Sequence, residues 1–272
     1  MLNNFLKYIL PDFLVKIINK ILKRDIQIVG KYLNWDEALN NSMGYDDNRI
    51  FDKSKKSFIK VLNNEAYYER DSVLFYKENI NYSLIKILNE INFKLKRVIN
   101  ILDFGGSFAS TYFQNRKILK NNKNFTWSII EREQIINYVN TSRIRKKIKN
   151  SYSNLNFYLT IKDYLRFYSP DLVLFSSVLQ YLPKPFDILK FLININVKYF
   201  LILRTPFHQF ADEIKIQIVP KHIYKSNYPI RIFNEKSFLK YFLKNSYKNI
   251  PVDFKKEIVD NFNFKNFFLK HY

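Results

Sequence analysis

The chain contains no cysteine and only three histidines among its 272 residues. Without cysteine it has no disulfide, no thiolate zinc site and no cysteine nucleophile; this composition fits a reducing compartment, and we expect a cytoplasmic protein. The histidines are His208, His222 and His271, and none has a nearby histidine or acidic cluster, which argues against a metal centre. The hydrophobic fraction of 47% is still ample for a folded core.

A continuous apolar stretch of about 20 residues, as a transmembrane helix needs, is also missing. Residues 1–24 come nearest: apolar side chains recur there at helical spacing, but Pro11, Asp12 and several Lys and Asn interrupt them. The segment has no small-residue cleavage site of the signal-peptide kind. Two interpretations stay open. The amphipathic stripe packs on the protein's own core or on a second subunit, or it lies on an anionic membrane surface, at the inner face of the membrane.

Acidic residues are scarce beside basic ones, since 24 Asp and Glu face 45 Lys and Arg and give a formal net charge of +21. Such a field attracts anionic partners such as nucleic acid, lipid headgroups or nucleotide-activated substrates. The basic residues are spread along the chain, and Lys, Asn, Ile, Phe and Tyr are abundant together, as in proteins from AT-rich genomes. We therefore interpret most of the excess charge as a solvated surface and expect no nucleic-acid partner.

Strand-like apolar runs begin only near residue 96, which predicts a helical extension over residues 1–95 and a second domain over residues 96–272. The predicted strands of that domain cover residues 98–102, 126–130, 155–159, 171–175 and 197–203. Continuous apolar runs separated by helix-sized segments predict a mostly parallel sheet with helices on both faces, an α/β fold. Farther on, residues 214–219 alternate like a half-buried strand, and Asn234 is a predicted helix N-cap.

Glycine is rare, and two of the four glycines, Gly105 and Gly106, stand together. A chain this poor in glycine keeps it where φ is positive or where another group approaches the backbone closely. The pair follows a predicted strand and precedes a predicted helix over Thr111 to Leu119, as in the first βα unit of a nucleotide-binding fold.

The turn fits a dinucleotide poorly. The pattern G-x-G-x-x-G needs three glycines, and only Gly105 meets it, which disfavours NAD and FAD. Asp103, two residues earlier, would also set a carboxylate against a pyrophosphate. A ligand with an ammonium and a sulfonium group but no phosphate makes the same carboxylate favourable, and S-adenosyl-L-methionine is such a ligand.

These residues resemble the first motif of class I methyltransferases, acidic-x-Gly-x-Gly-x-Gly, laid onto Asp103, Gly105, Ser107 and Ala109. Ser107 and Ala109 stand where the motif has glycine, and their Cβ atoms narrow the pocket. In that superfamily an acid after the second strand holds the ribose hydroxyls, and Glu131 occupies that place. The resemblance implies a Rossmann-like fold that binds S-adenosyl-L-methionine. The residues it implies for cofactor binding are Asp103, Phe104, Gly105, Gly106, Ser107, Glu131 and Ser176.

Further segments resemble a family of bacterial methyltransferases associated with surface-polysaccharide gene loci. They cover residues 30–38, 42–46, 69–75, 103–107, 176–181, 204–207 and 217–220, and they include all four glycines. The resemblance implies a methyltransferase whose acceptor is a saccharide or another small molecule, with a hydroxyl as the expected methylated group. The Asn/Asp-Pro-Pro-aromatic signature of amino-methylating enzymes is absent after residue 175, which argues against exocyclic base nitrogens as acceptors.

The groups that act on the acceptor are expected after the carboxyl ends of the fourth and fifth strands. Methyl transfer needs an acceptor held in line and a base for its proton, and His208 has the most suitable ordinary pKa. Arg204 would hold an acceptor phosphate, and Tyr181 would line the methyl pocket. For each a structural role stays open: a surface-loop histidine, an ion pair of Arg204 with Asp212 or Glu213, and aromatic packing of Tyr181.

Two other functions remain to be weighed against the methyltransferase. A nucleic-acid-binding or RNA-modifying protein would account for the charge, and its binding would weaken steeply with salt. A non-catalytic Rossmann-like module of a glycan assembly complex would account for the missing glycines of the turn.

Overall fold

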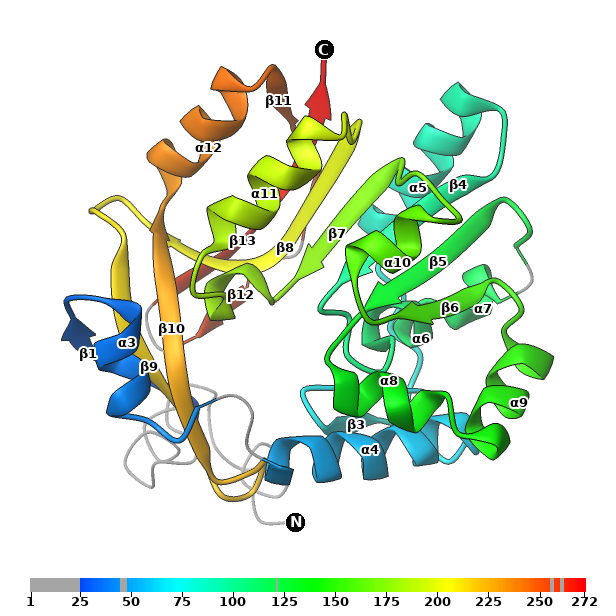
Figure 1. Cartoon of the computed structure of the whole chain (residues 1–272), viewed down its shortest axis with the longest axis horizontal. Coiled ribbons are helices and arrows are strands. Elements are labelled where there is room, and N and C mark those ends of the chain that lie inside the picture. The colour runs from blue at the N-terminus through cyan, green and yellow to red at the C-terminus, as the bar shows by residue number, and fades with distance from the viewer. Residues whose placement is uncertain (1–24, 45–47, 121, 255–256, 260–261) are drawn as a thin grey trace, which may run out of the picture.

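The centre of the molecule is a sheet whose middle strands run parallel (Figure 1). The computed structural model describes residues 25–44, 48–120, 122–254, 257–259 and 262–272, so the predicted stripe of residues 1–24 lies outside the described residues. Neighbouring parallel strands follow the order β6, β5, β4, β7 and β8. Their bounds are Ile99–Phe104 for β4, Phe125–Ile130 for β5, Leu155–Tyr158 for β6, Leu172–Ser176 for β7 and Tyr199–His208 for β8.

The order of the strands creates a crevice. The chain builds outward from β4 to β6 and then returns to the other side of β4 with β7, so the direction reverses between β4 and β7. Beyond β8 the sheet continues with an antiparallel strand, which pairs in turn with two short strands; the bounds are Phe262–His271 for β13, Tyr247–Ile250 for β11 and Glu257–Val259 for β12. This is a mostly parallel, Rossmann-like α/β sheet with helices on both faces, which confirms the predicted fold class. Ligands bind such sheets at the carboxyl ends of the strands where the order reverses.

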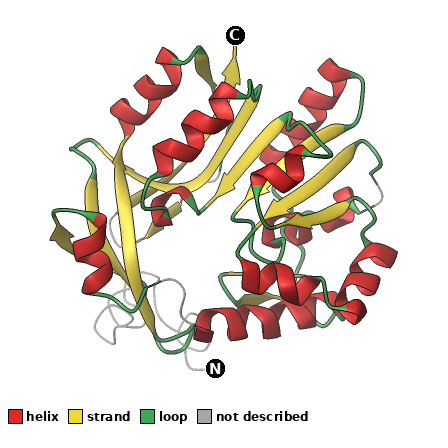
Figure 2. Ribbon diagram, in the orientation of Figure 1, coloured by secondary structure: helices red, strands yellow, loops and turns green. Residues whose placement is uncertain are grey.

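Successive residues of the central strands enter two different hydrophobic cores. In β4, Ile101 packs into one core and Leu102 into the other, and in β7 Leu174 and Phe175 divide in the same way. The period of two residues places alternate side chains on opposite faces of the sheet. Because helices cover both faces, these strands are apolar throughout, which is why their sequences predicted them (Figure 2).

Helices close both faces. On one face α5 (Tyr82–Leu95) buries Leu84 and Leu88, whereas α11 (Pro185–Asn194) buries Leu189 on the other. The other helices of this part are α8 (Glu133–Val139), α9 (Ser142–Ser151), α10 (Ile161–Leu165), α12 (Glu235–Lys244) and the 3₁₀ turn η1 (Leu179–Tyr181). Helix α12 begins at Asn234, whose side chain accepts a hydrogen bond from the Ser237 backbone N–H, so the predicted N-cap is confirmed.

The helix predicted over Thr111 to Leu119 is divided in two. It forms α6 (Ser110–Gln114) and α7 (Arg116–Leu119), with Asn115 between them. Asn115 is fully buried, donates its side-chain N–H to the Thr111 carbonyl and accepts the Asn81 backbone N–H. The asparagine side chain thus competes with the backbone for helix hydrogen bonds, which ends the first helix.

The described residues of the extension, 25–44 and 48–95, form strands as well as helices. Besides α3 (Trp35–Asn40), α4 (Asn48–Leu62) and α5 they contain β1 (Gln27–Tyr32), β2 (Tyr68–Arg70) and β3 (Val73–Phe75). Strand β1 joins the large sheet by pairing with β9, and its Ile28 packs against Ile230 and Ile232. One buried residue in a six-residue strand is too weak a pattern for sequence to reveal. The division into residues 1–95 and 96–272 stays a prediction.

An antiparallel ribbon projects past the crevice. It consists of β9 (Glu213–Val219) and β10 (Ser226–Asn234), so the predicted alternating strand is present. Strand β7 pairs with β8 only as far as Leu203, and β10 pairs with β8 at Phe207 and His208, beyond the end of β7. The ribbon therefore stands beside the carboxyl ends of the parallel strands, and Ile50 at the start of α4 packs against its Val219 and Tyr228 (Figure 1).

Candidate functional site

The glycine turn follows β4 at the point where the strand order reverses. Gly105 has a positive φ of 68°, and a Cβ there would overlap the Val178 side chain. Gly106 meets a different obstacle, because its Cβ would lie 2.7 Å from Cγ of Asp103. Each glycine is thus required for a close approach, as predicted from their rarity.

The next positions of the turn show why the family motif has glycine there. Ser107 has a φ of 52° and Ala109 a φ of 63°, both in the left-handed region. This region costs a residue with a Cβ roughly 1–2 kcal/mol. Serine and alanine therefore adopt the glycine conformation in this chain, and the turn keeps its shape at an energetic cost.

Glu131 ties the turn to the end of β5. Its Oε2 accepts a hydrogen bond of 3.0 Å from the Ser107 backbone N–H, and its Oε1 accepts one of 2.8 Å from the Arg132 N–H. The Arg132 Nε lies 3.5 Å from Oε1. A carboxylate thus occupies the turn amide that a phosphate-binding loop would offer to its ligand.

A cavity of about 850 Å³ opens in front of the turn. Its walls come from the ends of β4, β5, β6 and β7 and from α3, and they are mainly apolar. The lining residues include Phe104, Gly105, Glu131, Ile161, Ser177, Val178, Tyr181, Trp35 and Leu39. Of the residues predicted to bind a cofactor, Phe104, Gly105 and Glu131 lie here together. We refer to this space as the donor cavity.

Asp103 lies beneath the turn and not on a cavity wall. Its side chain is fully buried, and its Oδ2 accepts a hydrogen bond of 3.1 Å from Nε1 of Trp127. Burial raises the pKa of Asp103 to about 7; the Trp127 hydrogen bond opposes the shift, and the charge of Glu131 adds to it. Asp103 therefore supports the backbone of the turn from below, rather than facing a ligand directly.

Arg204 sits at an irregularity of β8. It has a φ of 52°, and the register of the facing β13 shifts at Asn266, whose Oδ1 accepts the Arg204 backbone N–H at 2.8 Å. A bulge of this kind re-aims a side chain beside an active site. The guanidinium reaches Ser176 Oγ at 3.3 Å and lies 3.8 Å from the Asp71 carboxylate. Its ion pair is with Asp71 and not with the Asp212 or Glu213 considered from sequence.

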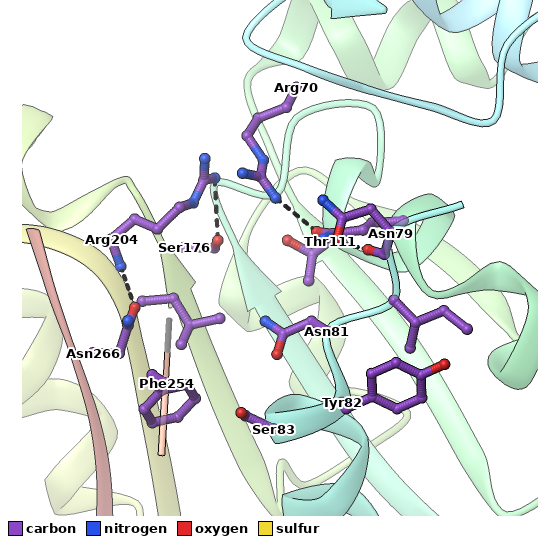
Figure 3. Close-up of a pocket in the computed structure, with 13 residues that line it drawn as sticks. Arg70, Asn79, Asn81, Tyr82, Ser83, Thr111, Ser176, Arg204, Phe254 and Asn266 are labelled. Carbon is purple, nitrogen blue, oxygen red and sulfur yellow. Dashed lines mark hydrogen bonds between the residues drawn. The ribbon is translucent and has the colours of Figure 1, made fainter. Parts of the chain in front are cut away.

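Tyr181 lines the donor cavity and also a smaller cavity of about 90 Å³ beside it. Its hydroxyl donates to Oε1 of Gln217 at 3.0 Å, and burial raises its pKa. Asp71, Ser177 and Arg204 also line the small cavity. Arg204 and Ser176 in turn line a third, polar cavity of about 480 Å³ (Figure 3), so the three spaces meet around the ends of β7 and β8.

His208 is not brought to these cavities. It ends β8 opposite Asn234, and its ring contacts that of Phe210. Strand β8 continues four residues past Arg204, so His208 is carried away from the crevice instead of entering a loop above it. The base predicted from sequence therefore lies apart from the other candidate residues.

Arg70 and Asp71 are site residues that sequence reasoning left without a role. They come from the β2–β3 hairpin, where Asp71 and Ser72 both have positive φ, and the hairpin reaches the ends of β7 and β8 from the extension. Buried Glu69 supports it by accepting hydrogen bonds from the Ser110 hydroxyl and the Ser72 backbone N–H. The segment 69–75 was noticed only through the family resemblance.

Two structural features are absent from the described residues. Among them there is no group of three or more His, Cys, Asp or Glu placed to hold a metal ion. Nor does that part of the chain contain a helix that is long and apolar enough to cross a membrane.

No protein-family model matches the chain, and no curated protein matches it in sequence. Several solved structures are similar. One is the N-terminal domain of EvdMO1 with SAH and D-fucose, with 11% identity, a TM-score of 0.48 and coverage of 83% of this chain and 96% of that one. Another is magnesium protoporphyrin IX methyltransferase (ChlM) from Synechocystis PCC 6803 with SAM, with 11% identity, a TM-score of 0.41 and coverage of 81% and 97%.

A third is CalS10, an amino pentose methyltransferase from Micromonospora echinaspora, with SAM bound. It is 7% identical, has a TM-score of 0.43, and is matched over 92% of its chain and 71% of this one. At these identities and TM-scores a function has to be argued from the residues of the site itself.

Proposed function

We propose that the protein is a methyltransferase that uses S-adenosyl-L-methionine as the methyl donor, bound in the donor cavity. The observation that carries the proposal is the position of Glu131, which lines the cavity at the end of β5 while accepting the Ser107 backbone N–H. An acid at this place in a nucleotide-binding sheet suits ribose hydroxyls. Gly105, with no Cβ, lets the turn lie against Val178, and both residues line the cavity.

The charge of the site favours this donor over a dinucleotide. The Glu131 carboxylate uses the turn amide, Asp103 lies beneath the turn, and α6 has only five residues, so little is left to attract a phosphate. A nucleoside with a sulfonium and an ammonium group is attracted by the Glu131 carboxylate. The apolar walls around Ile161 and Val178 suit an adenine ring.

We further propose that the acceptor is a hydroxyl of a saccharide or similar small molecule, with surface-polysaccharide biosynthesis as the setting. The acceptor would occupy the small cavity, which adjoins the donor cavity at Ser177 and Tyr181. The saccharide and its setting are supported by the family resemblance of the sequence, and the hydroxyl is supported by the polar groups of this cavity.

The chain's own residues would then hold the acceptor and remove its proton. When bound, the donor supplies a methyl group on sulfur: the acceptor oxygen forms the new C–O bond while the S–C bond breaks and its electron pair returns to sulfur. Asp71 is the carboxylate that lines the small cavity, and we assign it as the base that takes the hydroxyl proton. Arg204 lies 3.8 Å from Asp71 and positions that carboxylate.

Calorimetric titration of the full chain with S-adenosylmethionine and S-adenosylhomocysteine tests the donor assignment. Both are expected to bind, and Glu131→Gln is expected to weaken both strongly. Glu133→Gln is the matched control, because Glu133 is an exposed acid two residues away that does not line the donor cavity. Failure of both ligands to bind would leave a non-catalytic module; equal affinity of the Glu131→Gln variant would mean that the donor lies elsewhere.

A further inference from the structure

The polar cavity of about 480 Å³ is a separate space from the donor cavity. The two share no lining residue, although Ser176, the last residue of β7, lines the polar cavity and the following Ser177 lines the donor cavity. The small cavity lies between the two. It shares the lining residue Arg204 with the polar cavity and the lining residue Ser177 with the donor cavity. A molecule longer than one sugar ring would therefore extend from the small cavity into the polar one.

Two arginines face each other across this cavity. Arg70 comes from the extension and Arg204 from β8, and their guanidinium groups point toward one another from opposite walls (Figure 3). Each is held by the protein: Arg70 donates to Oε1 of Gln114 at 2.8 Å, and Arg204 donates to Ser176 Oγ at 3.3 Å. Fixed guanidinium groups bind tetrahedral oxyanions with little loss of side-chain freedom.

The amide side chains of the cavity add further donors. Asn81 uses its Oδ1 to accept the Leu84 backbone N–H, and Asn266 uses its Oδ1 to accept the Arg204 N–H. Neither side-chain nitrogen donates a hydrogen bond to another described residue, and both residues line the cavity. In each amide the Oδ1 atom is bonded to the backbone, and the NH₂ group can donate to a ligand.

No acidic side chain is found among the described residues that line this cavity. On the side of the small cavity, the Asp71 carboxylate lies 3.8 Å from Arg204. The walls therefore carry two positive charges and hydrogen-bond donors. An anion with several oxygen atoms complements this arrangement, whereas a neutral sugar does not.

We propose that the polar cavity binds a phosphate group carried by the acceptor, so that the substrate is a phosphorylated saccharide. This inference rests on the proposed methyltransferase function for the identity of the acceptor, and on the cavity alone for the binding of phosphate. The phosphate lies between Arg70 and Arg204, and the attached sugar reaches the small cavity beside Asp71. The phosphate anchors the acceptor and takes no part in the methyl transfer.

The test is calorimetric titration of the full chain with inorganic phosphate, and then with a sugar phosphate, at constant ionic strength. Each titration is done without and with saturating S-adenosylhomocysteine. Phosphate is expected to bind in both conditions, and Arg70→Gln and Arg204→Gln are each expected to weaken it by roughly 10- to 100-fold. A sugar phosphate that binds more tightly than phosphate identifies the acceptor class; equal affinity shows a site for free phosphate and overturns that part of the inference.

Arg166→Gln provides the control, because Arg166 is exposed and distant in sequence from the cavity, and it removes the same charge. An equal loss of phosphate binding in this variant would mean attraction by the general positive field, against the inference. Competition between phosphate and S-adenosylhomocysteine would mean that the cavity holds the carboxylate of the donor, also against it. Phosphate binding without any binding of the donor would leave this site standing and remove the proposed function.

Discussion

The backbone at Gly106 lies directly on the carboxylate of Asp103. A Cβ at Gly106 would be 2.7 Å from both Cγ and Oδ2 of Asp103. The carboxylate is thereby sealed between the turn above it and the Trp127 indole that donates to it. The turn and its acidic residue thus form one packed unit.

Gly106→Ala is expected to destabilise the protein by roughly 1–3 kcal/mol, because the new methyl group has to displace a buried carboxylate. Binding of S-adenosylhomocysteine should weaken as the turn shifts. Urea unfolding and calorimetry measure the two effects. Gly44→Ala is the control: Gly44 has a φ of 78°, but its Cβ would meet only Leu39 at 3.5 Å, so it reports left-handed strain without overlap. Wild-type behaviour of Gly106→Ala would show that the turn is looser than described.

Stability is expected to depend on pH through Asp103. Its pKa in the folded protein is raised to about 7 by burial, so the folded state retains a proton that the unfolded state releases near pH 4. This contribution to stability is therefore full below about pH 4 and is lost as pH rises to about 7, by up to about 4 kcal/mol. Buried Glu69, whose pKa is also raised to about 7, acts in the same direction.

Asp103→Asn should flatten that dependence, because an amide does not titrate. Urea unfolding between pH 5 and pH 8 gives the slope, which is expected to fall by up to about 1.4 kcal/mol per pH unit relative to the unmodified chain. In a Trp35→Phe background, Trp127 is the single tryptophan, and its fluorescence should titrate with Asp103. An unchanged slope in the Asn variant would assign the pH dependence to other groups.

Glycine is expected to be tolerated or favoured at Ser107 and Ala109. Both have positive φ, so Ser107→Gly and Ala109→Gly each remove left-handed strain of about 1 kcal/mol. Glycine also raises the conformational entropy of the unfolded chain, which opposes this gain in stability. The expected net change in unfolding free energy runs from none to a gain of about 1 kcal/mol. Ser110→Gly, in the first turn of α6, should instead destabilise. If Ser107→Gly and Ala109→Gly each lowered the unfolding free energy by about 1 kcal/mol, the two positions would not be strained.

Asp71→Asn is expected to lower kcat for an identified acceptor by roughly 10²-fold or more, because no base then takes the proton of the acceptor hydroxyl. The affinity for S-adenosylhomocysteine should stay unchanged, since Asp71 does not line the donor cavity. Asp52→Asn, on the exposed side of α4, serves as the control. A full rate in the Asp71→Asn variant would remove Asp71 from the reaction.

Sequence predicted the parts of the site that depend on local order along the chain. Strands β4, β5, β7 and β8 are buried on both faces, so apolar runs predict them, and the place of Glu131 follows from its position after β5. Sequence does not give the position of His208, because that position depends on how far β8 continues, which is set by pairing with β10 and β13. Arg70 and Asp71 were missed because a hairpin of the extension reaches the site only in the folded chain.

Strand β8 changes partners along its length, from β7 before Arg204 to β10 after it. The ribbon of β9 and β10 supplies Gln217 and Tyr228 to the small cavity but touches the donor cavity only through Pro229. Acceptor choice and donor binding can therefore diverge independently among relatives of this chain. Exchanging residues 213–234 between two such relatives should transfer the preference for an acceptor. The affinity of each protein for the methyl donor should stay unchanged.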